Sequence, residues 1–295
     1  MGKYRKAKLI ERVDGKKLYM VASVNDESVI VTDARSKKPV GSVQGEDVIY
    51  FQEINRIEFE RKNKEKENIM SFYAPNNVGI LLTIANKALV EAQRIYNEEI
   101  DPDKINHTDI VNGGKENELK EKTVIVYEFI EAIQTSIVFG YTAIEAFTNL
   151  SINDDYKYEN SIDSKGIIEI YDKKAIERWL SLDVKISNIL ADIYKCRTIK
   201  NEKIWNKFKL FEDCRNQIIH QKSIDVNNFY EKYFNKEIFE LCSVPEKIIK
   251  YFFEKDKDSH IANELWPLVE NADNEIPIYT KTKKELMEFV RKTNE

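Results

Sequence analysis

Cysteine and histidine are scarce in this sequence, and none of them has the spacing of a disulfide framework or a zinc site. The 295 residues include three histidines and three cysteines, Cys196, Cys214 and Cys242. There is no C-x-x-C pair, and no histidine lies at zinc-ligand spacing from another histidine or a cysteine. An odd cysteine count without paired spacing indicates a reducing compartment. We therefore expect no disulfide, no metal and no cofactor.

Long apolar runs are also missing. The first residues are basic, and the apolar segment of a secretory signal does not follow them. The longest stretch without a charged residue, 68–86, is interrupted by Pro75 and two adjacent asparagines, so it lacks the composition of a bilayer span. We therefore expect a cytoplasmic protein that does not enter a membrane.

Charges of both signs are plentiful, with an acidic excess. Charged residues make up 33% of the chain and hydrophobic residues 42%, which excludes collagen-like, low-complexity and wholly disordered proteins. The length corresponds to about two domains. The formal net charge of −5 excludes non-specific coating of nucleic acid. The charge is uneven, however, because residues 195–222 carry eight basic and three acidic side chains.

Hydrophobic periodicity divides the chain into a β-rich part and a helical part. β-Branched residues nearly alternate over residues 17–24 and 28–33, and residues 47–59 form a third candidate strand. From Val78 onwards, apolar residues recur at three and four residues, which predicts a helix. Further helices are predicted over residues 122–150, 173–180, 183–195, 202–221, 235–254 and 282–292, with an irregular insertion over 151–171.

These patterns predict an α+β protein that is mainly α-helical. The polar residues 99–121 contain Asp101-Pro102 and Gly113-Gly114, and they are the best candidate for a linker. The predicted organisation is an N-terminal β-rich module over residues 1–98 that ends in a helix, the linker over 99–121, a helical domain over 122–255 and a C-terminal extension over 256–295.

The helix predicted over residues 202–221 carries an arginine within its apolar stripe. At about 100° per residue, Arg215 falls near the middle of this stripe. The stripe consists of Ile204, Phe208, Phe211, Cys214 and Ile218. A charge that points towards a core needs a partner, because an unpaired buried charge is very costly. On the helix predicted over 122–150, Glu145 lies at the edge of an apolar stripe and one turn from Asn149. We therefore predict an ion pair between Arg215 and Glu145.

The segment Arg215-Asn216-Gln217-Ile218-Ile219-His220 resembles the R-N-x-x-x-H form of the motif that marks the HEPN superfamily. As in that family, the motif comes late in a predicted helical bundle. The A-x-E-A-F-x-N run at residues 143–149 and the segment 177–185 also resemble the family. The resemblance covers roughly residues 118–255, slightly under half of the chain. It implies a HEPN-like helical bundle for the C-terminal domain.

Active HEPN proteins are metal-independent endoribonucleases, usually dimers whose two motifs meet across a symmetric cleft. By this resemblance Arg215, Asn216 and His220 are the candidate catalytic residues, with Glu145 and Asn149 in supporting roles. Cleavage without a metal uses the 2′-OH of RNA as the nucleophile. It needs a group that moves protons near neutral pH and a fixed cation for the charge on the phosphate, which a histidine and an arginine supply. The resemblance also implies a toxin or antiviral defence role, with a regulatory or inhibitor protein as a candidate partner.

The spacing of the motif favours a homodimer. Arg215 and His220 lie about 140° apart around an ideal helix, so one helix does not direct both side chains at a single phosphate. Two such helices related by a two-fold axis would bring four side chains to a composite site. Among the basic residues near the motif, Lys207 and Lys222 are candidate RNA-binding residues.

Other interpretations fit the same residues. Arg215 and Glu145 can form a purely structural pair, and the basic side chains of residues 195–222 can form an ordinary solvated helix face. Trp205, Phe208 and Phe211 fit a core better than a platform on which bases stack. The alternative function is a non-catalytic HEPN-like module that binds a protein or a nucleotide.

Overall fold

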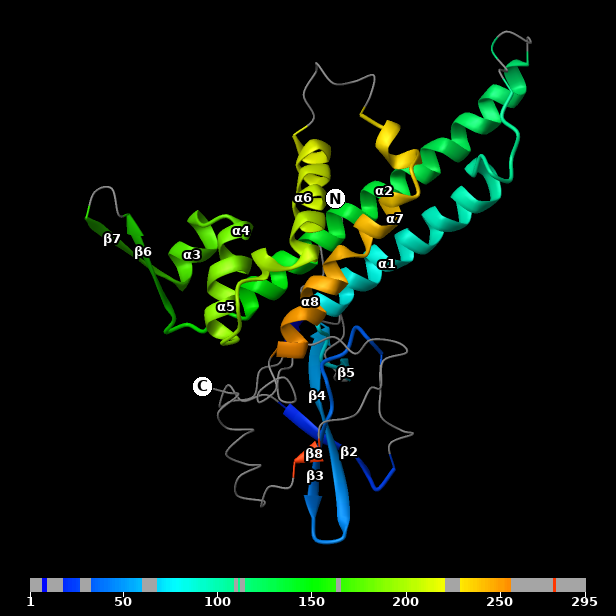
Figure 1. Cartoon of the computed structure of the whole chain (residues 1–295). Coiled ribbons are helices and arrows are strands. Elements are labelled where there is room, and N and C mark those ends of the chain that lie inside the picture. Colours follow the sequence, from blue (N-terminus) through cyan, green and yellow to red (C-terminus); the bar gives the residue numbers. More distant parts are fainter. Residues whose placement is uncertain are drawn as a thin grey trace, which may run out of the picture. The chain divides into compact units, whose positions relative to one another are not determined.

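The chain folds into two compact units and is α+β, mainly helical, as the sequence predicts. The computed structural model describes residues 7–9, 18–26, 33–59, 68–108, 111, 115–162, 166–220, 229–255 and 278–279. One unit comprises Met1–Gly79 with Ser259–Glu295, and the other comprises Ile80–Asp258. Figure 1 labels the helices of the second unit and the strands of the first unit except the strand at residues 7–9.

The first unit is built around one long strand, β4 (Asp47–Phe59). This strand pairs antiparallel with four others: β1 (Ala7–Leu9), β2 (Leu18–Val24), β3 (Val40–Gln44) and β5 (Ile69–Tyr73). Because β2 and β3 both pair with residues 49–51 of β4, they lie on its opposite edges. The short strand β8 (Ile278–Tyr279) adds to β3 in parallel.

Two of the predicted strands are confirmed. Residues 18–24 form β2, and residues 47–59 form β4 along their full predicted length. The predicted strand over residues 28–33 lies outside the described residues except for Asp33. The sequence pattern does not predict β3 and β5, because each has only five residues. An alternation that short does not stand out from chance.

The first long helix, α1 (Asn77–Ile95), begins at the boundary between the two units. Its start is capped by Asn76, whose Oδ1 accepts hydrogen bonds from the backbone N–H groups of Val78 at 3.0 Å and Gly79 at 3.4 Å. The helix continues as a π-helical turn, η2 (Tyr96–Ile100).

The predicted domain boundary at residues 99–121 differs from the observed division. The Tyr96 ring packs on Phe129 and Phe239, with centroid distances of 6.0 and 5.3 Å. This aromatic contact places the end of α1 in the helical unit, so residues 99–121 connect two helices of one unit. Composition alone suggested a linker because polar, glycine-containing loops occur within domains as well as between them.

The helical unit is arranged around α2 (Glu116–Leu150), on which α6, α7 and α8 pack. The other helices are α3 (Lys173–Trp179), α4 (Leu182–Val184), α5 (Leu190–Ile193), α6 (Lys203–Ile219), α7 (Glu237–Cys242) and α8 (Val244–Lys255). A π-helical turn, η3 (Lys185–Ile189), joins α4 to α5. The predicted helix over 235–254 is two helices, because Pro245 lacks an N–H donor and disfavours helical geometry at the residue before it. The helix predicted over 282–292 lies outside the described residues.

The central helix α2 starts six residues earlier than the predicted residue 122. Its buried face includes Phe129, Ile133, Ile137, Ile144 and Phe147. By length and composition, α2 contains a stretch that could also cross a membrane. This is weak evidence for a span, because the core helix of a soluble bundle meets the same criterion.

The insertion predicted to be irregular over residues 151–171 is largely a β-hairpin. Strands β6 (Lys157–Ile162) and β7 (Ile167–Asp172) pair antiparallel in an unbroken register. Tyr158 and Tyr171 face each other with ring centroids 6.5 Å apart, and Gly166 has a φ of +62° beside the turn. Polar residues in β6 conceal the strand pattern, while the isoleucines of β7 supply its β propensity.

Three helices approach one another closely at Gly140 of α2. A Cβ atom added to Gly140 would lie 2.7 Å from Pro245 Cγ of α8 and 3.3 Å from Phe211 Cζ of α6. The first distance is shorter than a van der Waals contact, so no larger residue fits without displacing α8. Gly140 thereby sets how near α6 and α8 come to α2.

We expect Gly140→Ala to lower the free energy of unfolding by about 1–3 kcal/mol, because the added methyl group overpacks this contact. The loss should appear although alanine favours a helix by about 1 kcal/mol relative to glycine. Urea unfolding followed by circular dichroism measures it. The control Thr142→Ala changes an exposed residue of the same helix and should shift the value by less than about 0.5 kcal/mol. A Gly140→Ala protein as stable as the wild type would contradict the close approach.

Candidate functional site

The candidate catalytic residues lie at the C-terminal end of α6. The helix ends at Ile219, and His220 is its C-cap, with φ −117° and ψ 40°. The backbone N–H of His220 donates a hydrogen bond to the carbonyl oxygen of Asn216 at 2.8 Å. Both the Asn216 and His220 side chains are exposed. Because His220 leaves helical geometry, its direction relative to Arg215 is not the about 140° of an ideal helix.

Arg215 is held by an aromatic ring. It is half-buried, and its Cζ lies 4.6 Å from the centroid of the Tyr141 ring on α2. Its Nη1 donates a hydrogen bond to Asn216 Oδ1 at 3.1 Å. Within the described residues Arg215 forms no ion pair, so the predicted pair with Glu145 is wrong. The prediction assumed full burial, whereas a half-exposed guanidinium keeps enough hydration to need no carboxylate.

Of the two residues predicted to support the site, Asn149 accepts a hydrogen bond from a buried lysine. Lys185 is 2% exposed, and its Nζ donates to Asn149 Oδ1 at 3.1 Å and to the Glu177 carbonyl oxygen at 3.0 Å. Burial lowers the pKa of Lys185, and the negative charges of Glu145 and Glu177 partly oppose this. Asn149 therefore belongs to the contact between α2 and the segment α3–η3, while Glu145 influences Lys185 through its charge.

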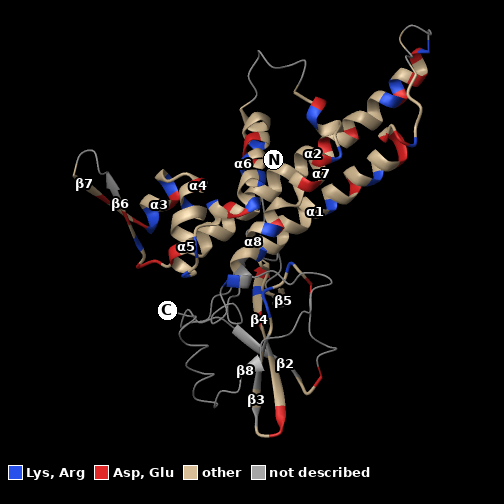
Figure 2. Cartoon of the chain, viewed as in Figure 1, with Lys and Arg blue, Asp and Glu red and all other residues tan. Residues whose placement is uncertain are grey.

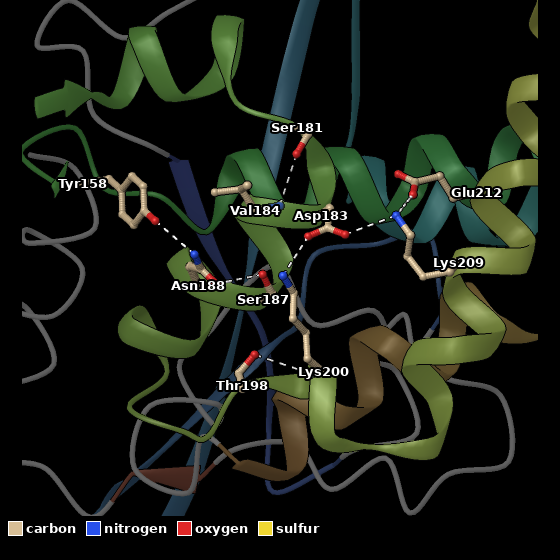
Figure 3. A network of polar contacts seen from close by, with 10 residues as sticks. All are labelled: Tyr158, Ser181, Asp183, Val184, Ser187, Asn188, Thr198, Lys200, Lys209 and Glu212. Atoms are coloured by element: carbon tan, nitrogen blue, oxygen red, sulfur yellow. Dashed lines mark hydrogen bonds and ion pairs between the residues drawn. The ribbon is translucent and has the colours of Figure 1, made fainter. Parts of the chain in front are cut away.

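A chain of polar contacts connects α2, α6 and α4 beside Arg215. The Tyr141 hydroxyl donates to Glu212 Oε1 at 3.2 Å. Lys209 donates to the other oxygen of Glu212, Oε2, and to Asp183 Oδ2 at 3.1 Å. Asp183 also pairs with Lys200 Nζ at 3.1 Å. Figure 3 shows Asp183 between the two lysines, with Glu212 beyond Lys209.

Burial and charge act in opposite directions on the groups of this chain. Burial raises the pKa of Asp183, but hydrogen bonds from Lys200 and Lys209 outweigh it and the pKa is lowered. Burial raises the pKa of Tyr141, and the charge of Glu212 raises it further while that of Arg215 lowers it. The Asp183 carboxyl is thus ionised and the Tyr141 hydroxyl protonated near neutral pH, which lets Tyr141 donate to Glu212.

The basic segment 195–222 is partly neutralised. Lys207, a candidate RNA-binding residue, forms an ion pair with Glu240 of α7, and Lys200 and Lys209 are paired as described above. Figure 2 shows acidic as well as basic residues on α6. Lys222, the other candidate, lies outside the described residues. Trp205, Phe208 and Phe211 are buried, which confirms them as core residues.

Lys209, Glu212 and Tyr141 were not predicted from the sequence as residues near Arg215. A signal was present, because Lys209, Glu212 and Arg215 are spaced three residues apart, a distance at which side chains meet on a helix. The third neighbour could not be found this way. Tyr141 belongs to another helix, and its position follows from the contact at Gly140.

The rest of the described chain offers no metal site of the usual composition, since no group of three or more His, Cys, Asp or Glu side chains converges there. All three cysteines are free, as predicted. No protein-family model, curated protein or solved structure matches this chain.

The free energies of unfolding distinguish a stacked arginine from a buried ion pair. We expect Arg215→Ala to lower the free energy of unfolding by about 0.5–1 kcal/mol, as for a partly exposed cation–π contact. Breaking a buried ion pair would lower it by about 3–5 kcal/mol. A double-mutant cycle of Arg215→Ala with Glu145→Ala should give a coupling below about 0.5 kcal/mol. The matched cycle of Arg215→Ala with Tyr141→Leu should give the larger coupling energy. A larger coupling of Arg215 with Glu145 than with Tyr141 would instead support the predicted Arg215–Glu145 ion pair.

Proposed function

We propose that this protein is a metal-independent endoribonuclease of the HEPN type that acts as a homodimer with a composite active site. One observation carries the proposal. Arg215 and Asn216 lie near the end of α6 and His220 is its exposed C-cap, and within the described residues Arg215 stacks on Tyr141 and forms no ion pair. An accessible arginine that keeps its full charge beside a histidine suits binding and cleavage of a phosphodiester.

The proposed reaction is a transesterification within the RNA. The 2′-oxygen attacks the adjacent phosphorus while a histidine removes the 2′ proton, and the P–O5′ bond breaks as the leaving 5′-oxygen takes up a proton. The products are a 2′,3′-cyclic phosphate and a 5′-hydroxyl. Arg215 stabilises the negative charge on the phosphoryl oxygens. His220 transfers protons, and the Asn216 amide orients Arg215 through the hydrogen bond already formed between them.

A toxin or antiviral defence role fits this activity, because unspecific RNA cleavage stops growth of the cell. The β-rich unit would sense a signal, regulate the nuclease or select a regulatory or inhibitor protein. This assignment rests on architecture by analogy with the family that the motif resembles.

Cleavage should persist in EDTA and depend on His220. We expect the purified protein to cut a generic single-stranded RNA in EDTA to products with 2′,3′-cyclic phosphate ends. His220→Ala should lower the rate by about 10²–10⁴-fold, the usual contribution of a general acid or base. Because His220 is exposed at a helix end, the melting temperature of the His220→Ala variant should equal that of the wild type. The control Asn206→Ala, exposed on the first half of α6, should cut normally.

If the wild type cuts no RNA, or if His220→Ala unfolds the protein, the non-catalytic binding module becomes the better interpretation.

A composite site can be tested by mixing two inactive variants. If one Arg215 and one His220 from different subunits complete a site, heterodimers of Arg215→Ala and His220→Ala should recover part of the activity that each homodimer lacks. Rates are measured after joint refolding or co-expression, with each variant alone as the control. Activity of a strictly monomeric wild type at full rate would contradict the composite site.

A further inference from the structure

Arg215 stacks on a tyrosine although two carboxylates lie close to that ring. The Tyr141 hydroxyl contacts Glu212, and the charges of both Glu212 and Glu145 raise the pKa of Tyr141. Glu212 also precedes Arg215 by three residues on α6, a spacing at which acidic and basic side chains commonly pair. Something must therefore keep Glu212 from capturing the guanidinium.

Both oxygens of the Glu212 carboxylate are already occupied. Tyr141 donates to Oε1 and Lys209 donates to Oε2. Lys209 is itself held in place by Asp183, 3.1 Å away, and Asp183 is held by Lys200 (Figure 3). Glu212 is only 14% exposed, so it cannot turn towards Arg215 without leaving these donors unpaired.

The ring contact also leaves the guanidinium able to bind an anion. A cation over an aromatic face is attracted by the ring quadrupole, which uses none of its N–H donors. Within the described residues the one side-chain hydrogen bond of Arg215 is that from Nη1 to Asn216. A phosphate needs two parallel N–H groups for a bidentate contact, and an arginine has five.

We propose that Tyr141 and Lys209 are positioning residues for Arg215. Tyr141 holds the guanidinium over its ring, and Tyr141 and Lys209 together occupy Glu212, so that Arg215 stays free to bind a phosphate of the substrate. This inference rests on the proposed function. It assigns the alternating chain Asp183, Lys209, Glu212 a role in the electrostatics of the site as well as in packing α4 against α6.

The decisive experiment first removes the Lys209 hydrogen bond to Glu212 and then removes the charge of Glu212. Lys209→Met leaves Oε2 without a donor, so Glu212 should pair with Arg215 and weaken RNA binding by about tenfold, the effect of about 1.4 kcal/mol. The double variant Lys209→Met with Glu212→Gln should restore binding, because no carboxylate is left to capture Arg215. If the network had only a structural role, the double variant would bind RNA more weakly than Lys209→Met alone. The conservative Lys209→Arg should bind as the wild type does.

Binding is measured by fluorescence anisotropy with a labelled 2′-O-methyl RNA oligonucleotide of mixed sequence, which the proposed reaction cannot cut. With cleavable RNA, Lys209→Met should raise KM more than it lowers kcat. For the ring, Tyr141→Phe keeps the aromatic face but removes the donor to Glu212 Oε1, so only Lys209 still holds this carboxylate and the affinity should fall by no more than about threefold. Tyr141→Leu removes the face and should lose about tenfold in affinity, as expected for a cation–π contact of 1–2 kcal/mol, roughly.

A second readout does not depend on activity. The Nε–Hε signal of Arg215, assigned through Arg215→Lys, should carry a ring-current shift in the wild type and in Tyr141→Phe but not in Tyr141→Leu. In Lys209→Met it should move towards the position of an ion-paired arginine and return when Glu212→Gln is added. If the wild type binds no RNA, the proposed function fails while this signal still decides the arrangement of Arg215. An Arg215 signal that ignores Lys209→Met, or a double variant no better than the single one, overturns the proposal.

Discussion

The close approach of α6 and α8 to α2 at Gly140 is the constraint on which the helical unit depends. It places α6 so that Arg215 lies over Tyr141, the residue next to Gly140, and not over Glu145 one turn further on. The same approach buries Phe208 and Phe211. A single position without a side chain thus decides which residue of α2 faces the candidate catalytic arginine. Helix packing therefore determines these polar contacts, because the side chains can reach one another only when the helices lie this close.

Much of the fold follows from local patterns, whereas the contacts within the site do not. The periods of residues 18–24 and 203–219 are regular enough to predict β2 and α6, and the apolar residues of 47–59 indicate β4 although Glu53 and Asn55 interrupt their pattern. The α+β class and the buried aromatic residues of α6 follow from the same patterns. The β6–β7 hairpin and the end of α1 escape prediction, because cross-strand pairing and the packing of Tyr96 are decided by residues distant in sequence.

The error about Glu145 has a specific physical origin. An apolar stripe on a helix predicts the direction of a side chain but not how deeply it is buried, and the need for a counter-charge depends on depth. Arg215 is partly exposed and stacks on a ring, whereas the buried Lys185 donates hydrogen bonds to Asn149 Oδ1 and the Glu177 carbonyl oxygen. On α2 the residue that contacts a buried cation is thus Asn149, whereas the residue predicted to pair with one was Glu145.

The ion pairs of Lys200, Lys207 and Lys209 also bear on how an RNA strand would meet this surface. A lysine that already faces a carboxylate holds few mobile anions, and displacing that carboxylate with a phosphate exchanges one paired state for another. Binding of a polyanion gains much of its free energy from the counterions that it releases into solution. With Lys207 and Lys209 of α6 and the preceding Lys200 all internally paired, this surface would release few counterions. Association at this face would then depend only weakly on ionic strength. The protein would bind RNA through separate collisions and would not slide along the strand.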